Sequence, residues 1–345
     1  MNASVSKTVL IITDYRDLFY HSVRFKDTGM DVDQIGKFFD ERGWLVRWKK
    51  FPEIDFRNEN YQGQFILYQS SEDRNLFYQS YIEDILLGLK LQGAILIPDF
   101  YCFRAHHNKV FMEILRDITK GEELKNITTK GFGAYEDFAP ELRAFQSKWV
   151  LKPSEGCGSM GIKLLQDERS KRKYAKKVSR SLHWLDGIKN IVKSYVWPNY
   201  IKQSNNRKKF IIQSYIPGLE HDYKVLVYGD KYYVLLRRIR KKDFRASGSG
   251  MFEYQETIPD GLLNYAEAVF NCFQIPYLSI DIGFDGKEFF VFEFQFLKFG
   301  NYTIEKSPFY FVRKDQKWSK IQGSSNLEKE FVASVVRYID EYKLV

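Results

Sequence analysis

The segment WVLKPSEGCGSMGI, residues 149–162, joins a short apolar run to a glycine-rich loop through a single cation. We predict a strand over 149–152 that places Lys152 at its end, with Pro153 opening the loop. Glycines let backbone N–H groups approach phosphate oxygens closely because no Cβ intervenes, so the pattern favours a phosphate-binding loop. It is not a P-loop, since no Gly-Lys-Ser/Thr follows, and a glycine turn between two strands is the alternative. The loop contains Ser154, Gly156, Cys157, Gly158, Ser159 and Gly161.

A second segment, FEFQF at 292–296, has the alternation of a strand. Glu293 and Gln295 share one face, and the three phenylalanines share the other, which we expect to be buried. Upstream, Asp281 lies in the middle of the strand LSIDIGF, where a carboxylate is costly unless it is paired or bound to a metal. Hard oxygen ligands of this type suit Mg²⁺. An ion pair of Asp281 with a nearby Arg or Lys is the alternative.

Strand parity sets a condition on this metal site. Asp281 and Glu293 can share a metal only if both leave the same face of the hairpin that joins 278–284 to 288–296. A regular two-residue turn at Asp285-Gly286 would place the two carboxylates on opposite faces. We therefore predict an odd-length loop or a one-residue bulge, with Gly286 or a neighbour at positive φ.

A third segment, QSYIPGLEHDYKVLV at 213–227, looks like a strand end that runs into a loop. The edge at Gln213–Ile216 offers backbone groups that can read an adenine. Beyond the loop, Glu220, Asp222 and Lys224 alternate onto one face, and an acidic side chain there can hold ribose hydroxyls. The alternative is that these charged side chains are simply solvated, as charges at alternating strand positions usually are.

The segment RRIRKKDFRASGSG, residues 237–250, is strongly basic. Arg237 and Arg245 can neutralise phosphate charge. Together with the basic runs at 169–177 and 205–209, this segment also raises the alternative of a nucleic-acid-binding or surface-binding protein. For the Lys-rich helix expected near 169–180 we favour a solvated face, so nucleic acid is not the expected partner.

The remaining pattern predicts an α/β chain. Strands and helices alternate over the first hundred residues, which implies an open, mostly parallel sheet. Helical spacing at 106–118 carries Lys109, and a second α/β part follows it. We expect strands at 9–13, 44–48, 65–69, 94–97, 210–215, 223–228, 232–240, 278–284 and 288–296, and further helices at 33–42, 78–90, 262–273 and 326–342.

Composition sets the broad class of the protein. A length of 345 residues predicts two or three domains, and 44 % hydrophobic residues permit a sizeable core. The formal charge of +9 is a mild bias toward an anionic partner such as a nucleotide, nucleic acid, acidic polymer or lipid surface. Three widely spaced cysteines form no disulfide framework or zinc pattern. With no apolar stretch long enough to span a bilayer, we expect a cytoplasmic protein.

In this order and spacing, five segments resemble the ATP-grasp superfamily, most closely the ribosomal-protein glutamate ligases and other carboxylate–amine ligases. The resemblance implies an N-terminal α/β domain at 1–105, a small subdomain with the glycine loop at 106–210, and a C-terminal subdomain with the metal site at 211–345. The two subdomains would enclose the nucleotide. The matching segments are HHNKVF, VLKPSEGCGSMGI, IIQSYIPG, DFRASGS and the pair IDIGF and FEFQ, which span about 106–296.

The resemblance also implies roles for single residues. Lys109 and Lys152 would bind the α- and β-phosphates of ATP, and the segment from Gly156 to Gly161 would close over the γ-phosphate. Arg237 would stabilise the transferred phosphoryl group, and Arg245 would orient the acceptor carboxylate. The adenine site would contain Gln213, Tyr215 and Ile216, the ribose site Glu220 or Asp222, and the Mg²⁺ or Mn²⁺ site Asp281, Glu293 and Gln295.

The implied reaction is an ADP-forming ligation that activates a carboxylate as an acylphosphate, which an amine then attacks. It needs positioning and charge neutralisation and no nucleophilic cysteine, so we interpret Cys157 as a small loop residue. The chain departs from the ligase pattern at Gln295, where Asn is usual, and at Ser247, where the glutamate ligases carry Asn. It also has Phe296-Leu-Lys-Phe-Gly300 after Gln295, where the ligases usually have Ser-Pro-Gly. The substrate can be a small molecule, a peptide, or a carboxylated sugar or polysaccharide precursor. A carboxylase-like or kinase reaction stays open as an alternative, as does a homodimer.

Overall fold

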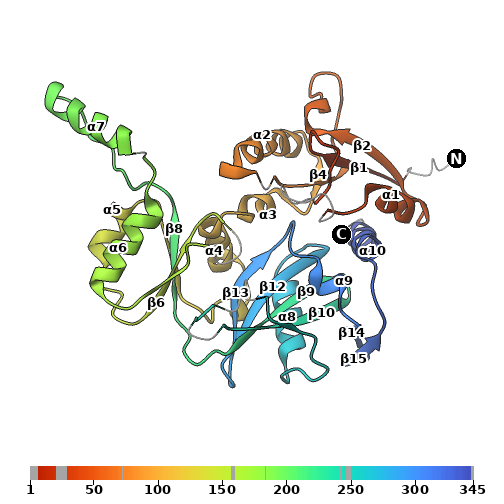
Figure 1. Ribbon diagram of the computed structural model, residues 1–345. Helices are drawn as coiled ribbons and strands as arrows, with labels where there is room; N and C mark the ends of the chain where they lie inside the picture. Colours follow the sequence, from red (N-terminus) through yellow and green to blue (C-terminus); the bar gives the residue numbers. More distant parts are fainter. Residues whose placement is uncertain are drawn as a thin grey trace.

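The computed structural model describes residues 7–20, 29–71, 73–156, 160–182, 184–240, 243–245 and 250–342. Three sheets organise these described residues (Figure 1). The N-terminal sheet lies at the top of this view, a large antiparallel sheet lies below it, and a small antiparallel sheet forms a lobe on the left. No helix in the described ranges is long and apolar enough to cross a bilayer.

The N-terminal sheet is parallel, in the order β2-β1-β3-β4, which confirms the predicted open sheet. All four residues from Val9 to Ile12 are buried, because helices and loops cover both faces of the central strand. The elements are β1 (Thr8–Thr13), α1 (Val32–Asp40), β2 (Leu45–Lys50), β3 (Phe65–Tyr68), α2 (Phe77–Leu91), β4 (Ile95–Ile97) and α3 (Phe100–Ala105).

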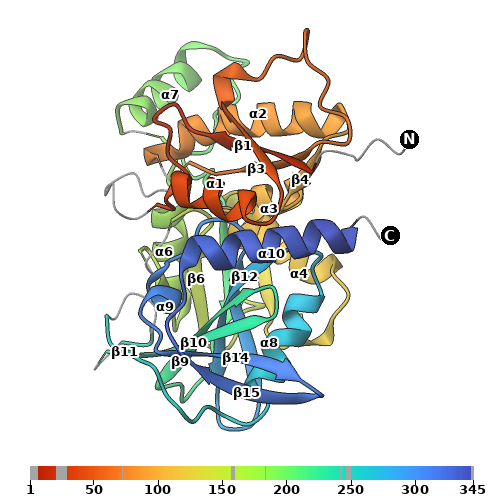
Figure 2. The ribbon, with the colours of Figure 1, turned by 90° about the vertical axis from the view of Figure 1, so that its right-hand side faces the viewer.

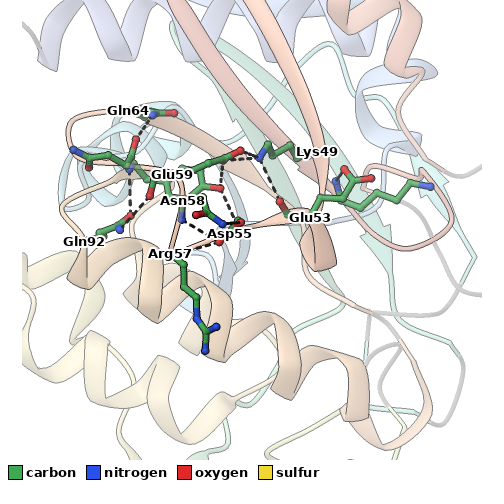
Figure 3. Close-up of polar contacts among 11 residues, drawn as sticks. Lys49, Glu53, Asp55, Arg57, Asn58, Glu59, Gln64 and Gln92 are labelled. Carbon is green, nitrogen blue, oxygen red and sulfur yellow. Dashed lines mark hydrogen bonds and ion pairs between the residues drawn. The ribbon is translucent and has the colours of Figure 1, made fainter.

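A polar network folds the long connection between β2 and β3 (Figure 3). Lys49 forms an ion pair with Glu59, and its ammonium also donates to the Glu53 carbonyl at 3.3 Å. The Asp55 carboxylate accepts from the backbone N–H of Arg57 at 2.9 Å. These local contacts give a fixed path to the connection, whose regular structure is the short 3₁₀ helix Phe51–Glu53.

The large sheet has the strand order β13-β12-β9-β10-β14-β15, with β11 paired to β10. Helices α4 and α8 cover one face, where Met112 and Leu263 join the main hydrophobic core. The elements are α4 (Lys109–Ile118), β9 (His221–Tyr228), β10 (Lys231–Arg238), β11 (Phe252–Glu253), α8 (Leu262–Asn271), β12 (Tyr277–Phe284), β13 (Phe289–Gln295), α9 (Tyr302–Glu305), β14 (Phe309–Lys314) and β15 (Lys317–Gln322).

Helix α10 (Leu327–Tyr342) lies between the N-terminal domain and the large sheet (Figure 2). Its Phe331 and Val335 belong to the same core as Ile35 of α1 and Tyr277 of β12. The Glu328 carboxylate accepts from the Asp31 N–H at 2.9 Å. The end of the chain therefore fixes the N-terminal domain onto the large sheet.

The small sheet has the order β5-β8-β6-β7, and α5 and α6 cover it. Helix α7 projects away from this lobe (Figure 1). The predicted boundary at residue 106 assigns α4 to this lobe. Met112 and Leu115 of α4 pack in the core of the large sheet, and the Glu113 carboxylate of the same helix accepts from the Thr129 hydroxyl of the lobe at 2.7 Å. The elements are β5 (Thr129–Phe132), α5 (Tyr135–Phe138), β6 (Trp149–Pro153), β7 (Lys163–Leu165), α6 (Glu168–Ser179), α7 (Trp184–Val196) and β8 (Phe210–Ser214).

The β12–β13 hairpin contains the predicted bulge. Asp281 lies directly opposite Glu293, and the register shifts by one residue between Asp281 and Ile282. Gly286 has φ +95°, as predicted, within a four-residue loop. The prediction that all three phenylalanines of FEFQF share a buried face was wrong for Phe292. The bulge takes this residue out of the alternation, so it lines the cavity described below while its two partners stay buried.

Candidate functional site

A cavity of about 500 Å³ lies between the small sheet and the large sheet. Strands β6 and β8 supply one wall, and β9, β10, β12 and β13 supply the other. Among the described residues that line it, six are Lys or Arg and four are Asp or Glu, so the cavity favours an anionic ligand. The predicted residues that line it are Lys109, Lys152, Gly156, Gln213, Tyr215, Ile216, Asp222, Arg237, Arg245, Asp281, Glu293 and Gln295.

Three predicted residues lie outside this lining. Ser154 is buried, and its hydroxyl hydrogen-bonds Asn108 at 3.2 Å, so it ties the end of β6 to the start of α4. Gly161 has φ +77°, and a Cβ there would lie 2.7 Å from Pro153, so this position requires glycine for the path of the loop. Glu220 is exposed. Cys157, Gly158 and Ser159 fall outside the described residues.

Two lysines approach the cavity from different elements. Lys109 is the first residue of α4, and its ammonium lies 3.3 Å from a Glu293 oxygen and 3.1 Å from the Gly156 carbonyl. Lys152 lies on β6, where burial lowers its pKa while the neighbouring Glu293 charge acts in the opposite direction. Both cations therefore lie beside the glycine loop, where phosphate oxygens can replace the carbonyl and carboxylate contacts.

The facing carboxylates of Asp281 and Glu293 each have their own cations. Asp281 is 2.8 Å from Arg237 and 3.3 Å from Lys224, measured between charged atoms. Burial alone would raise the pKa of Asp281, but Arg237 and Lys224 overcome it and hold that pKa at about 2. Glu293 likewise has a lowered pKa, because Lys109 outweighs its burial. Both groups are therefore ionised at neutral pH, as metal ligands must be.

The ion-pair alternative for Asp281 is present in the structure, and it is compatible with a metal site. Mg²⁺ usually takes one or two carboxylates together with substrate phosphates. Within the described ranges, no cluster of three His, Cys, Asp or Glu side chains could hold a metal. Asp281, Glu293 and the Gln295 amide all line the cavity, and their oxygens are of the kind that Mg²⁺ takes.

Asp222 orients Arg237. Its two oxygens accept from the Arg237 guanidinium at 2.7 and 2.8 Å, and both side chains are buried. Burial raises the pKa of Asp222, and Arg237 opposes that rise. An Asp222 engaged in this way is a poor candidate for ribose hydroxyls. Glu220 stands beside the lining residues Leu219 and His221 in the chain, and its side chain is exposed.

The end of β8 and the chain that follows it supply another part of the lining. Gln213 is buried at the end of β8, and Tyr215 and Ile216 follow where the chain leaves the sheet. The Tyr215 ring lies 6.4 Å from the ring of Phe244, centroid to centroid. The two rings meet edge to face, at 74° between their planes, and give this part of the lining an aromatic surface.

Arg245 lines the cavity near this aromatic pair, and its guanidinium holds Asp243 at 2.8 Å. This neighbour lowers the pKa of Asp243 to about 2. Where the ligase pattern has Ser-Pro-Gly, the lining instead contains Lys298, Phe299 and Gly300. The acceptor side of the cavity therefore has a different composition from the pattern.

Sequence reasoning missed several lining residues. Lys224 was predicted to share a face with Asp222 but was given no role in the site. The same alternation could have placed it beside Asp281. His106 and His107 line the cavity next to Lys109, and no spacing rule identifies them. Phe292 was missed because the bulge reverses its face, and its ring lies 5.9 Å from the Lys152 ammonium.

No protein-family model and no curated protein matches the chain. Solved structures do match over nearly its whole length. The D-cycloserine synthetase DcsG is similar with a TM-score of 0.56 at 12 % identity, covering 96 % of this chain and 99 % of that one. The ATP-grasp ligase PsnB, solved with a minimal precursor, Mg and ADP, gives 0.52 at 10 % identity, covering 98 % and 99 %. The D-alanyl-alanine synthetase A from Vibrio cholerae O1 biovar eltor gives 0.51 at 11 % identity, covering 97 % and 99 %.

These structures show that the chain has the ATP-grasp fold, as its sequence pattern implied. An N-terminal parallel sheet precedes two antiparallel sheets that enclose a cavity.

Proposed function

We propose that this protein is an ADP-forming ligase that joins a carboxylate to an amine at the expense of ATP. The observation that carries the proposal is the facing pair Asp281 and Glu293 on a bulged hairpin, surrounded by four cations that line one cavity. The cations are Lys109, Lys152, Lys224 and Arg237. A triphosphate with a divalent ion has the charge and the oxygen ligands that this arrangement requires.

The adenine would lie at Gln213–Ile216, with the triphosphate directed toward β12 and β13. Lys109 and Lys152 would hold phosphate oxygens, and the loop 154–161 would cover them. Asp281, Glu293 and Gln295 would hold Mg²⁺, which when bound neutralises phosphate charge and orients the oxygens. PsnB, which shares this fold, was solved with Mg and ADP, and this supports the same ligand pair here.

Arg237 is suited to the phosphoryl transfer itself. Asp222 and Asp281 fix both sides of its guanidinium, so it would meet the developing charge without rearranging. The substrate carboxylate would attack the γ-phosphorus, giving ADP and an acylphosphate. The amine would then displace phosphate and form the amide. No step requires a protein nucleophile, and Arg245 and Lys298 would orient the carboxylate substrate.

The test is a screen of amino acids, peptides and carboxylated sugars for stimulated release of ADP, with mass spectrometry of the products. The expected result is ADP and phosphate formed in equal amounts with a condensed product, and only when carboxylate and amine are both present. A phosphorylated product without phosphate release would indicate a kinase. ATP turnover that requires bicarbonate would indicate a carboxylase-like reaction.

A further inference from the structure

The positive charge of this protein is concentrated in one segment. Residues 163–209, called the basic segment below, contain 14 Lys and Arg residues and 3 Asp and Glu residues. The net charge of this segment is +11, whereas the whole chain has +9, so the rest of the protein is slightly acidic. The modest net charge of the whole chain therefore conceals a strongly cationic basic segment. The cavity between the sheets does not account for this charge.

Most cations of α6 lie on its exposed face, whereas Lys171 is buried on the core side. Arg169, Lys173, Lys176, Lys177 and Arg180 are all exposed, and their spacing of three and four residues places them on the same side. The opposite side, with Ala175, packs in the core of the small lobe. This arrangement is the solvated face that the sequence predicts, but it faces outward as a continuous basic strip.

Helix α7 carries an apolar face that the described structure leaves open. Leu185, Ile188, Val192, Tyr195 and Val196 recur at helical spacing, with exposed fractions between 47 and 86 %. The apolar surface continues beyond the helix at Trp197 and Ile201, which are 63 and 87 % exposed. Exposed apolar residues that form one contiguous stripe mark an interaction surface rather than ordinary surface variation.

The contacts of α7 show that this stripe faces away from the protein. Asn190, on the other side of the helix, is buried and donates to the Gln203 carbonyl at 2.8 Å. Its side-chain oxygen accepts a hydrogen bond from the Tyr200 hydroxyl. The helix is therefore anchored through its polar side to the returning chain, and it projects from the lobe (Figure 1).

We infer that the basic segment docks the protein on an anionic lipid bilayer, with the apolar face of α7 inserted at the interface. A projecting amphipathic helix suits this surface, because it has aliphatic residues and Tyr195 on one side, Trp197 directly after its end, and flanking lysines. Lys189, Lys193 and Lys202 are the exposed flanking cations, and the strip on α6 adds long-range attraction to anionic headgroups. This inference is independent of the proposed ligase activity.

The other anionic partners fit less well. Nucleic acid would satisfy the cations, but its phosphate surface offers no apolar phase for Leu185, Ile188 and Val192. A second copy of the chain would cover the stripe only by bringing two strongly cationic segments together. An acidic polypeptide segment usually binds in a groove of its partner, whereas the projecting helix α7 presents a convex surface.

The experiment is co-sedimentation of the full chain with vesicles of equimolar phosphatidylglycerol and phosphatidylcholine, compared with phosphatidylcholine alone. Binding to the anionic vesicles is expected, and it should fall steeply as salt is raised. The double variant Ile188→Ser/Val192→Ser should bind at least about tenfold more weakly, because both side chains lose apolar burial in the interface. Leu91→Ser, at a residue 80 % exposed in the N-terminal domain, is the matched control and should bind as wild type.

A second pair of variants tests the charge. Arg169→Gln/Lys173→Gln/Lys177→Gln should weaken vesicle binding by roughly a hundredfold at low salt. Arg57→Gln/Lys125→Gln/Lys287→Gln removes the same net charge from exposed sites elsewhere and should have a much smaller effect. Equal losses in both triple variants would show general charge attraction and overturn the docking surface.

Three further outcomes overturn the inference. Binding that is absent, or equal on neutral and anionic vesicles, removes the lipid partner. Self-association in ultracentrifugation that the Ile188→Ser/Val192→Ser variant abolishes would assign the face to a second copy. Binding of soluble polyglutamate that the same variant weakens as strongly as vesicle binding would assign the face to an acidic polypeptide. Trp197 fluorescence should shift to the blue on vesicles, and the shift should disappear in Trp197→Phe.

Discussion

The cavity and the basic segment are both rich in Lys and Arg. In the cavity most of these side chains are buried, whereas in the basic segment most of them are exposed to solvent. In the cavity, the Arg237 side chain is 7 % exposed and is fixed between Asp222 and Asp281. On α6, Arg169 and Lys173 extend into solvent from a helix face. Buried, paired cations can meet a ligand at a defined position, whereas exposed cations attract an anionic surface without fixing its orientation. The same residue types therefore serve recognition at one place and attraction at the other.

The largest effect is expected at Arg237, the most buried of the cations that line the cavity among the described residues. Arg237→Ala leaves the Asp222 and Asp281 carboxylates buried without their shared partner, so the free energy of unfolding should fall by about 3–5 kcal/mol. Denaturant unfolding measures this change. The neighbouring Arg238 pairs with Glu253 at the surface, and Arg238→Ala should cost no more than about 1 kcal/mol. Similar losses in the two variants would contradict the difference between the buried and exposed pairs.

Removing one carboxylate of the facing pair should affect metal binding more than folding. In Glu293→Gln, the affinity for Mg²⁺ in the presence of an ATP analogue should fall by at least about tenfold, because a charged ligand becomes neutral. Titration of Mg²⁺ followed by calorimetry measures this affinity. Glu253→Gln removes a surface carboxylate outside the cavity lining and should leave the affinity unchanged. If Glu293→Gln titrated like wild type, the shared metal site would be ruled out.

The bulge can be tested from the opposite strand. A Cβ at Gly283 would lie 2.4 Å from the Phe292 ring, so Gly283→Ala should displace that ring and lower the free energy of unfolding by about 1–3 kcal/mol. Thermal and denaturant unfolding both report this loss. Gly36→Ala is the control, since nothing lies within 4 Å of the position that its methyl group would take and alanine favours the helix. A stabilising Gly283→Ala would mean that Phe292 does not lie over this glycine.

The smallest effect concerns the glycine loop. Amide hydrogen exchange across 154–161 should slow when a non-hydrolysable ATP analogue is bound, since the loop would then donate to the γ-phosphate. The basic strip on α6 should exchange at the same rate with and without the analogue. Equal protection of the loop in both states would contradict its closing role.

The sequence predicted the parts of the site that follow from strand alternation and chain order. We predicted Asp281 and Glu293 on one face of the hairpin because two ligands of one metal must lie on the same side. A bulge or an odd-length loop was predicted because a regular two-residue turn would separate them. The same alternation failed for Phe292, because the position of a bulge within a strand depends on packing between strands. Ser154 and Asp222 were assigned to the ligand from the family pattern, and only side-chain geometry showed that they hold Asn108 and Arg237.

The outer parts of the fold were harder to predict. Helix α7 was not predicted, although its apolar residues have helical spacing, because the surrounding polar and basic residues gave no sign of a packed partner. The β14–β15 hairpin was also missed, since its strands mix exposed charged residues with aromatic ones at an edge of the large sheet. Both elements lie at the periphery of the molecule. Few of their residues are buried there, so the hydrophobic periodicity that predicts a helix or strand is weak.

The central claim is that the cavity binds magnesium-ATP independently of the basic segment, and calorimetric titration of a non-hydrolysable ATP analogue with Mg²⁺ tests it most directly. Wild type should bind one equivalent. Lys109→Ala and Lys152→Ala should each weaken binding by roughly 1.5–3 kcal/mol, because each loses a charge-assisted contact with phosphate. The Ile188→Ser/Val192→Ser variant should bind as wild type. Unchanged affinity in both lysine variants, or an equal loss in the α7 variant, would contradict the account.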